Sequence, residues 1–96
     1  MARRRILVAY DITCDRRRDR VFRTLNDFGD SIQYSVFLCD MNEREIIELR
    51  SRISTVLNHA EDQVLVVDLG LADQHAANRI VSIGRAFRPR ERVIVV

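Results

Sequence analysis

A single aspartate, Asp11, ends an apolar run that begins at Ile6 and closes with Tyr10. An arginine-rich segment follows it, with Arg16, Arg17, Arg18, Arg20 and Arg23. A carboxylate at the end of a buried strand is well placed to hold a divalent cation. Guanidinium groups suit phosphate, because their planar fork donates two parallel hydrogen bonds. The pattern therefore indicates chemistry on, or binding of, a phosphate ester.

Asp11 is an incomplete metal site by itself. Mg²⁺ takes about six oxygen ligands but accepts one or two carboxylates when water supplies the rest. A two-fold axis between two copies of the chain would add a second Asp11, and such a metal would activate water and neutralise a phosphate oxygen. Alternatively, Asp11 is structural and caps the loop over residues 12–15. The residues alone leave both alternatives open.

The arginine cluster also has two interpretations. Its natural use is sequence-independent contact with phosphate, which makes all five arginines candidates for nucleic-acid binding. The alternative is a solvated helix face with ion pairs such as Asp15–Arg18 and Asp19–Arg23. Arg18 precedes the apolar stripe of the same helix, so we expect its guanidinium to curl toward the strand end, near Asp11.

Charge is segregated along the chain, although the net charge is only +2. Residues 1–25 carry eight arginines against three aspartates, and residues 76–96 carry five arginines against one glutamate. Residues 26–75 carry ten acids against three arginines. We therefore expect both ends of the chain to contribute to one basic surface suited to nucleic acid. A compositional bias of the genome explains the number of arginines but not their clustering.

Length and composition predict one domain, with its core over about residues 4–70 and C-terminal strands over about residues 78–96 for dimer or partner contacts. No apolar stretch is long enough to span a bilayer or to form a signal peptide, so we expect a cytoplasmic protein without a membrane partner. The two cysteines lack metal-ligand spacing and are expected to be reduced, and both histidines are expected at the surface.

Hydrophobic periodicity predicts the elements that position the site. Residues 4–10 indicate a central strand that is apolar on both faces. Residues 15–28 indicate a helix with Thr13 or Asp15 as N-cap, ended by Gly29 as a left-handed C′ residue.

The rest of the chain continues this alternation. Residues 31–39 are extended, as one bent strand or two short ones, because no glycine or proline marks a turn. Residues 42–57 indicate a second helix. We then expect a strand over residues 63–69 and a connection over residues 70–77. A shorter strand over residues 79–83, closed by Gly84, and a last strand over residues 92–96, after Pro89, complete the chain.

This order fits an α+β fold, a ferredoxin-like split βαβ sandwich with extra C-terminal strands. A late, arginine-flanked strand is a candidate to pair with a second subunit in a two-fold homodimer, because an exposed sheet edge invites a partner.

A set of motifs stands at characteristic spacing between residues 6 and 39. It comprises Tyr10-Asp11-Ile12-Thr13, then Asp15, Arg17-Arg18, Arg20-Val21, Leu25, Gly29 and Gln33-Tyr34-Ser35-Val36-Phe37. In this joint spacing the chain resembles the CRISPR-associated protein 2 family, the small subunit of the spacer-acquisition machinery. The resemblance implies a ferredoxin-like homodimer that bridges two dimers of the CRISPR integrase and helps to bind the new DNA segment.

The resemblance also implies a site. Some family members are metal-dependent endonucleases acting on RNA or double-stranded DNA, and the metal ligand is the aspartate that ends the first strand, here Asp11. Mg²⁺ or another divalent cation is the implied cofactor. The resemblance marks five further catalytic positions: Tyr10, Arg18, Arg20, Ser35 and Phe37. The chain departs from some relatives at Ser31, where they carry a basic residue.

Three functions follow as hypotheses. The chain is a magnesium-dependent endonuclease, or a DNA-binding scaffold in which Asp11 is structural, or a toxin-like or regulatory ferredoxin domain without a CRISPR link. We favour a nucleic-acid-binding homodimer that bridges integrase subunits, with endonuclease activity on RNA or double-stranded DNA as a latent property. Residues 85–96 are the candidate contact with the integrase.

Overall fold

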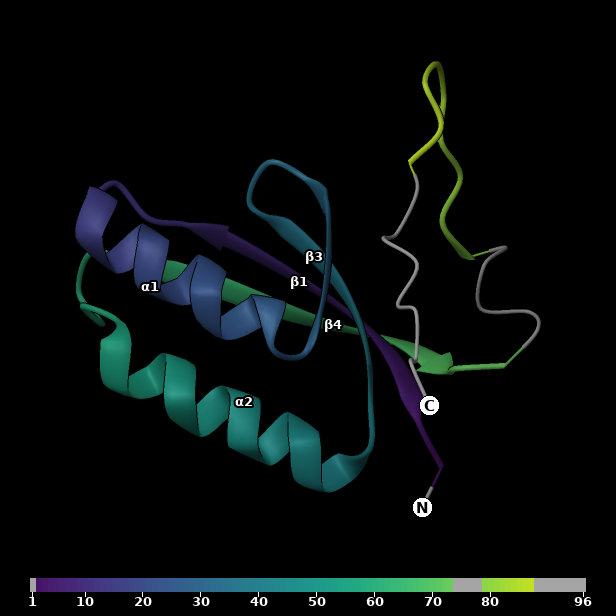
Figure 1. Ribbon diagram of the computed structural model, residues 1–96, viewed down its shortest axis with the longest axis horizontal. Helices are drawn as coiled ribbons and strands as arrows, with labels where there is room; N and C mark the ends of the chain where they lie inside the picture. The colour runs from purple at the N-terminus through teal and green to yellow at the C-terminus, as the bar shows by residue number, and fades with distance from the viewer. Residues whose placement is uncertain (1, 74–78, 88–96) are drawn as a thin grey trace, which may run out of the picture.

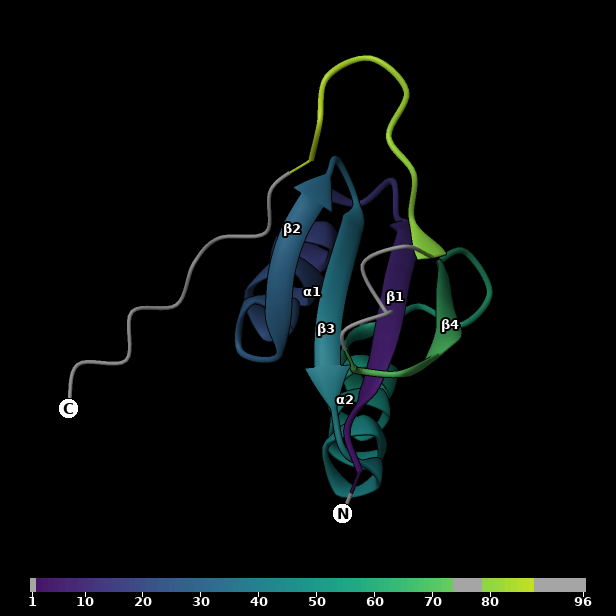
Figure 2. The ribbon, with the colours of Figure 1, turned by 90° about the vertical axis from the view of Figure 1, so that its right-hand side faces the viewer.

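The computed structural model describes residues 2–73 and 79–87. Residues 4–71 form an antiparallel sheet with two helices on one face (Figure 1). The elements are β1 Arg4–Asp11, α1 Asp15–Asn26, β2 Gly29–Gln33, β3 Val36–Met41, α2 Glu43–Val56 and β4 Gln63–Leu71. The strands lie in the order β2-β3-β1-β4 (Figure 2). This order is that of the ferredoxin-like split βαβ sandwich, so the predicted fold class is confirmed.

β1 is one of the two central strands, and its side chains alternate between the two faces of the sheet. Ile6, Val8 and Tyr10 are buried, whereas Leu7 and Ala9 are only partly covered. Val8 lies opposite Phe37 of β3, which is buried in the same core. Successive residues of a strand point to opposite faces, so the helices cover the Val8 face, and the other side is here called the open face.

Both helices bury the stripe that their periodicity predicts. Val21 and Leu25 of α1, and Leu49 and Ile53 of α2, belong to the core. α2 begins with a capping box, in which the Asn42 side chain accepts from the Glu45 N–H and the Glu45 side chain accepts from the Asn42 N–H. This reciprocal pair satisfies two of the amide groups left free at a helix start.

The predicted ends of α1 were wrong. The N-cap is Cys14, without a side-chain capping bond, rather than Thr13 or Asp15, and the helix ends at Asn26 rather than at residue 28. Gly29 is no left-handed C′ residue but the first residue of β2. A Cβ at Gly29 would lie 2.4 Å from the Sγ of Cys39, so close strand packing is what requires glycine there.

Residues 31–39 form parts of two strands rather than one bent strand. β2 and β3 pair as an antiparallel hairpin, with Tyr34 and Ser35 at its turn. Ser35 has a φ of 62°, the left-handed conformation usually given to glycine or asparagine. The turn contains neither glycine nor proline, so the sequence alone does not reveal that the chain reverses there.

The expected strand over residues 79–83 is not formed, and β4 runs on through Gly70, where a connection was expected. Residues 79–87 instead follow an irregular path on the side of the sheet away from the helices (Figure 1). A strand needs a hydrogen-bonding neighbour, and this segment finds none within the described part of the protomer. The expected strand over residues 92–96 lies outside the described residues. No helix among the residues described is long and apolar enough to span a bilayer.

Candidate functional site

Asp11 ends β1 as an exposed carboxylate. It follows Leu7 and Ala9 in the alternation of the strand, which places it on the open face. Among the described residues, its carboxylate has no hydrogen-bond or ion-pair partner. A charged group at a strand end without a structural partner is available to a ligand, so the expected loop-capping role finds no support.

Tyr10 points to the other side of the sheet. Its side chain is buried at 8% exposure and stacks on Phe37, with ring centroids 6.4 Å apart. Its backbone N–H donates to the carbonyl of Ser35 at 3.0 Å. The structure therefore brings Tyr10, Ser35 and Phe37 together on the helix side, and separates them from Asp11 by the thickness of the sheet.

Burial raises the pKa of the Tyr10 phenol, while a side-chain hydrogen bond with Ser35 and the charge of Arg18 act in the opposite direction. The phenol is therefore neutral near pH 7. It can hold or orient a polar group, but it is a poor base there.

Phe37 lies inside the core, with 0% exposure. It packs between Tyr10 and Phe22, whose ring lies edge-on at 5.4 Å between centroids. Its side chain supports the groups around it and does not reach a substrate in this conformation.

Arg18 reaches the strand end, as its helix position predicts. Its Nη1 donates to the carbonyl of Ile12 at 3.0 Å, and its Nη2 pairs with the carboxylate of Asp15. The guanidinium thus holds the loop directly after Asp11 rather than the Asp11 carboxylate itself. The expected Asp15–Arg18 ion pair is confirmed.

Arg17 is tied to the loop between α2 and β4. Its Nε donates to Asp62 at 2.7 Å and its Nη2 to Glu61 at 3.1 Å. The Asp62 side chain is inaccessible to solvent and also accepts the N–H of Asn58 at 2.9 Å. Hydrogen bonding from Arg17 holds the pKa of Asp62 below its ordinary value. Arg17 therefore fixes the start of α1, and a phosphate contact would require it to leave this pair.

Arg16 and Arg20 differ from the other arginines of α1. Both are exposed, and neither side chain has a partner among the described residues. Arg23 forms the expected ion pair with Asp19, at 2.9 Å and largely in solvent. Arg20 and Arg23 also line a shallow hollow of about 360 Å³ with Arg52 of α2. The unpaired positive charge of α1 therefore lies on its exposed surface, at Arg16 and Arg20.

The arginines at the start of the chain do not add to this surface as expected. Arg3 pairs with Glu45 at 2.8 Å and Arg4 with Asp68 at 2.7 Å. Arg5 pairs with Asp40. The acidic middle of the sequence thus neutralises these N-terminal arginines in space.

A hollow of about 290 Å³ lies on the helix side of the β1 tip. Tyr10, Arg18 and Ser35 line it, as do Phe22 and Tyr34, which sequence reasoning did not select for the site. The signal that could have found Phe22 is its position seven residues after Asp15 on the same stripe of α1.

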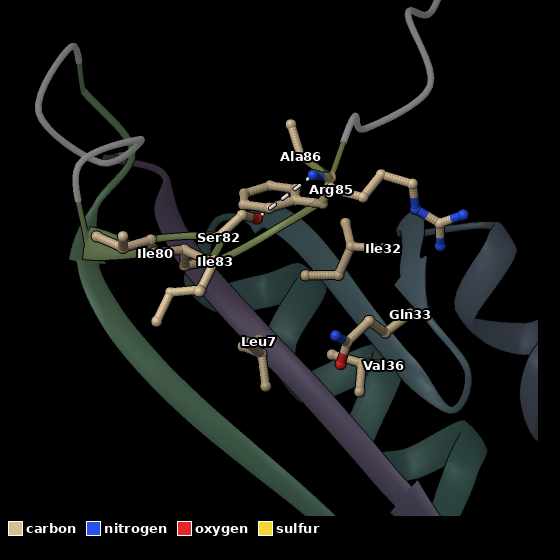
Figure 3. A pocket seen from close by; sticks show the side chains of 11 residues that line it. Leu7, Ile32, Gln33, Val36, Ile80, Ser82, Ile83, Arg85 and Ala86 are labelled. Atoms are coloured by element: carbon tan, nitrogen blue, oxygen red, sulfur yellow. Dashed lines mark hydrogen bonds between the residues drawn. The ribbon is translucent and has the colours of Figure 1, made fainter.

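A second groove, of about 430 Å³, lies on the open face. Figure 3 shows Leu7, Ile32 and Val36 of the sheet on one side and the segment that contains Ile80 and Ile83 on the other. Gln33 also lines this groove.

A metal bound by this chain alone would have few protein ligands. Within residues 2–73 and 79–87, no three His, Cys, Asp or Glu side chains lie close enough to hold one ion. Asp11 offers one free carboxylate, which fits Mg²⁺ when water or a second carboxylate completes the shell. The residues present therefore fit a shared or largely hydrated ion.

Residues 4–77 match the family model described as CRISPR associated protein Cas2. The chain belongs to the Cas2 family. A Cas2 protein of Geobacter sulfurreducens, named a CRISPR-associated endoribonuclease, is 43% identical over 91 residues, which are 93% of this chain and 95% of that protein.

Solved structures agree on the fold. Cas2 of Streptococcus pyogenes superposes with a TM-score of 0.71 at 22% identity, over 83% of this chain and 99% of its own. A chain of a partial Cas6-RT-Cas1–Cas2 complex gives a TM-score of 0.64 at 17% identity, over 83% of this chain and 90% of its own. At these identities the likeness concerns the fold, which is that of Cas2 structures.

Proposed function

We propose that this Cas2-family chain works in CRISPR spacer acquisition as a nucleic-acid-binding homodimer that bridges integrase subunits. The observation that carries the proposal is the family match over residues 4–77. The same fold occurs in a chain of a complex whose name includes Cas1 and Cas2, which supports an assembly role. Family membership argues against the toxin-like or regulatory alternative without a CRISPR link.

Contact with nucleic acid is supported by the free arginines of α1. Arg16 and Arg20 are exposed, and among the residues described they have no acidic partner. Such groups can neutralise phosphates without first breaking an ion pair, which makes them the strongest contributors to backbone binding.

Self-association is supported by the open face. Leu65 and Val67 of β4 are 51% and 42% exposed, and Val81 and Ile83 beside the groove are 80% and 97% exposed. A second copy that covers this face would bury these side chains, and apolar burial is the main driving force of association. Asp11 lies on the same face, so a two-fold axis there would bring its two copies toward each other.

Endonuclease activity is the second candidate function, and the free carboxylate of Asp11 favours it. The Geobacter relative is named an endoribonuclease, and a relative from Thermus thermophilus is named an endonuclease. When bound, Mg²⁺ would activate water and neutralise a phosphate oxygen. Asp11 from each subunit would hold it, while Arg18 keeps the adjacent loop in place and Arg20 binds phosphate.

The deciding experiment compares spacer acquisition and magnesium-dependent cleavage for the wild type and Asp11→Asn. We expect Asp11→Asn to lose cleavage and to keep acquisition, because the scaffold needs the surface rather than the metal. Asp40→Asn removes another exposed open-face carboxylate and is the matched control, which should keep both activities. Unchanged cleavage in Asp11→Asn would point to another site or a contaminating nuclease, and loss of acquisition would contradict the scaffold role.

A further inference from the structure

The hollow on the helix side of the β1 tip has no part in the proposed metal site. We propose that it binds an unpaired nucleobase of a single-stranded segment of RNA or DNA. The inference rests on the proposed nucleic-acid-binding function and adds the part of the substrate that this hollow would recognise. Its aromatic lining comes from three parts of the fold, since Tyr10 belongs to β1, Phe22 to α1 and Tyr34 to the turn between β2 and β3.

Three aromatic side chains line the hollow. Tyr10 is held in place by its stack on Phe37, whereas Phe22 is 40% exposed and Tyr34 is 83% exposed. Exposed rings beside a fixed ring offer stacking surfaces, and every base has a π face that stacks on them. The core does not require Tyr34, because its ring stands almost wholly in solvent.

The polar groups of the hollow favour a base over a phosphate. Asp15 and Asp19 contribute carboxylates, whose ion pairs with Arg18 and Arg23 leave further lone pairs that can accept hydrogen bonds. The Arg18 guanidinium is already engaged by Asp15 and by the carbonyls of Ile12 and Thr13. A neutral planar ring with N–H donors can use these acceptors, whereas a phosphate would meet two carboxylates and a committed arginine.

The hollow and the free arginines share the helix α1 but lie on different faces of it. The α1 residues that line the hollow occupy one stripe of the helix, namely Asp15, Arg18, Asp19 and Phe22. Arg16 and Arg20 come one position after Asp15 and Asp19, about 100° further around the helix. A single strand that crosses α1 can therefore place its phosphates on the arginines and turn a base into the hollow. In a duplex the bases are paired and stacked, so they are not available to it.

An apolar side chain of a partner protein is the competing occupant. It would use the aromatic rings, but it would make no hydrogen bond with the carboxylates or the Ser31 hydroxyl that line the hollow. The neighbouring unpaired arginines favour nucleic acid, so the protein occupant becomes one outcome of the test.

The test measures the affinity of the full chain, in EDTA to prevent cleavage, for a single-stranded RNA, a single-stranded DNA and a blunt DNA duplex of the same length. We expect Tyr34→Ala to weaken binding of the single strands about 5- to 100-fold, the range of one lost stacking contact, and to leave the duplex unchanged. Tyr34→Phe keeps the ring and should retain affinity. Arg20→Ala is the control that should weaken all three.

A second readout follows the base itself. A single strand with one 2-aminopurine should lose fluorescence on binding to the wild type and to Tyr34→Phe, because stacking quenches the base, but much less on binding to Tyr34→Ala. Phe22→Leu, which removes a half-exposed ring and keeps an apolar side chain, should act in the same direction.

Four outcomes overturn the inference. Equal loss of single-strand and duplex affinity in Tyr34→Ala would make Tyr34 a general contact. Unchanged single-strand binding with reduced integrase association would assign the hollow to a protein side chain. Duplex binding by the wild type with no single-strand binding would refute the base site but keep the proposed function. If the wild type binds none of the three nucleic acids, the proposed function fails as well.

Discussion

The two ends of β1 differ in whether their charged side chains are free to bind a ligand. At its N-terminal end, Arg3, Arg4 and Arg5 all face acidic partners contributed by α2, β4 and β3. Beyond its C-terminal end, Asp11 and the α1 arginines Arg16 and Arg20 have no partner among the residues that the structure describes. Residue type alone therefore does not define a binding surface, because a paired arginine presents little net charge to a polyanion.

The largest expected effect comes from removing the free arginines. The double variant Arg16→Ala, Arg20→Ala should bind duplex DNA roughly 10- to 100-fold more weakly near 0.1 M salt, because two phosphate contacts and their released counterions are lost. The slope of log affinity against log salt should become shallower by about 2. Fluorescence anisotropy at a series of salt concentrations measures both quantities.

The matched control removes two paired arginines instead, as Arg4→Ala with Arg5→Ala. Its net charge changes by the same amount, so equal losses in the two variants would show that total charge governs binding. A clear difference would sharpen the contrast between the ends of β1.

The second effect concerns stability and Arg17, the arginine of α1 that pairs with the buried side chain of Asp62. Since Arg17 lowers the pKa of Asp62 in the folded state, this carboxylate stabilises the fold above its unfolded pKa of about 3.9 and loses that contribution as the pH falls through the lower folded value. Asp62→Asn should therefore be less stable than the wild type at pH 7. The difference in free energy of unfolding between the two should become smaller near pH 3. Urea unfolding at the two pH values measures it.

Asp11→Asn serves as the control for that measurement, because no partner for the Asp11 carboxylate lies within the described residues. It should unfold almost as the wild type does at either pH. If Asp62→Asn differs from the wild type by the same free energy of unfolding at pH 7 and at pH 3, the proposed contribution of the Arg17–Asp62 ion pair is contradicted.

The smallest effect is expected at the N-terminal end. The Arg4–Asp68 pair lies largely in solvent, with side-chain exposures of 42% and 50%, and exposed ion pairs contribute little net stability. Arg4→Ala should therefore leave the urea midpoint almost unchanged. A marked loss would mean that this end of β1 is held by its charges rather than by its apolar neighbours.

Local patterns of the sequence account for most of the fold. A continuous apolar run locates β1, and the stripes around Leu25 and Leu49 locate the helices, because these features depend only on residues nearby in the sequence. The hairpin turn was not predicted, because Ser35 has a left-handed backbone conformation that serine seldom adopts. The role of Gly29 escaped too, because it depends on Cys39 across the sheet.

The site was predictable only in part. Asp11 and the arginine cluster follow from spacing, but the partner that removes Arg17 from the free set lies 45 residues away, at Asp62. Consecutive residues of a strand point to opposite faces of the sheet, so Tyr10 and Asp11 could not have belonged to the same face. The prediction that placed them in one site did not apply this rule. The exposure of Tyr34 depends on the hairpin and could not be read from its neighbours.

The two cysteines of the chain offer a selective chemical handle. Cys39 is 1% exposed against Gly29, whereas Cys14 is partly exposed at the start of α1. The backbone N–H of Arg17 lowers the pKa of the Cys14 thiol, which favours the reactive thiolate. A maleimide dye should therefore label the native protein at Cys14 alone, next to Arg16. The wild-type chain could then report polyanion binding by fluorescence without an engineered attachment point.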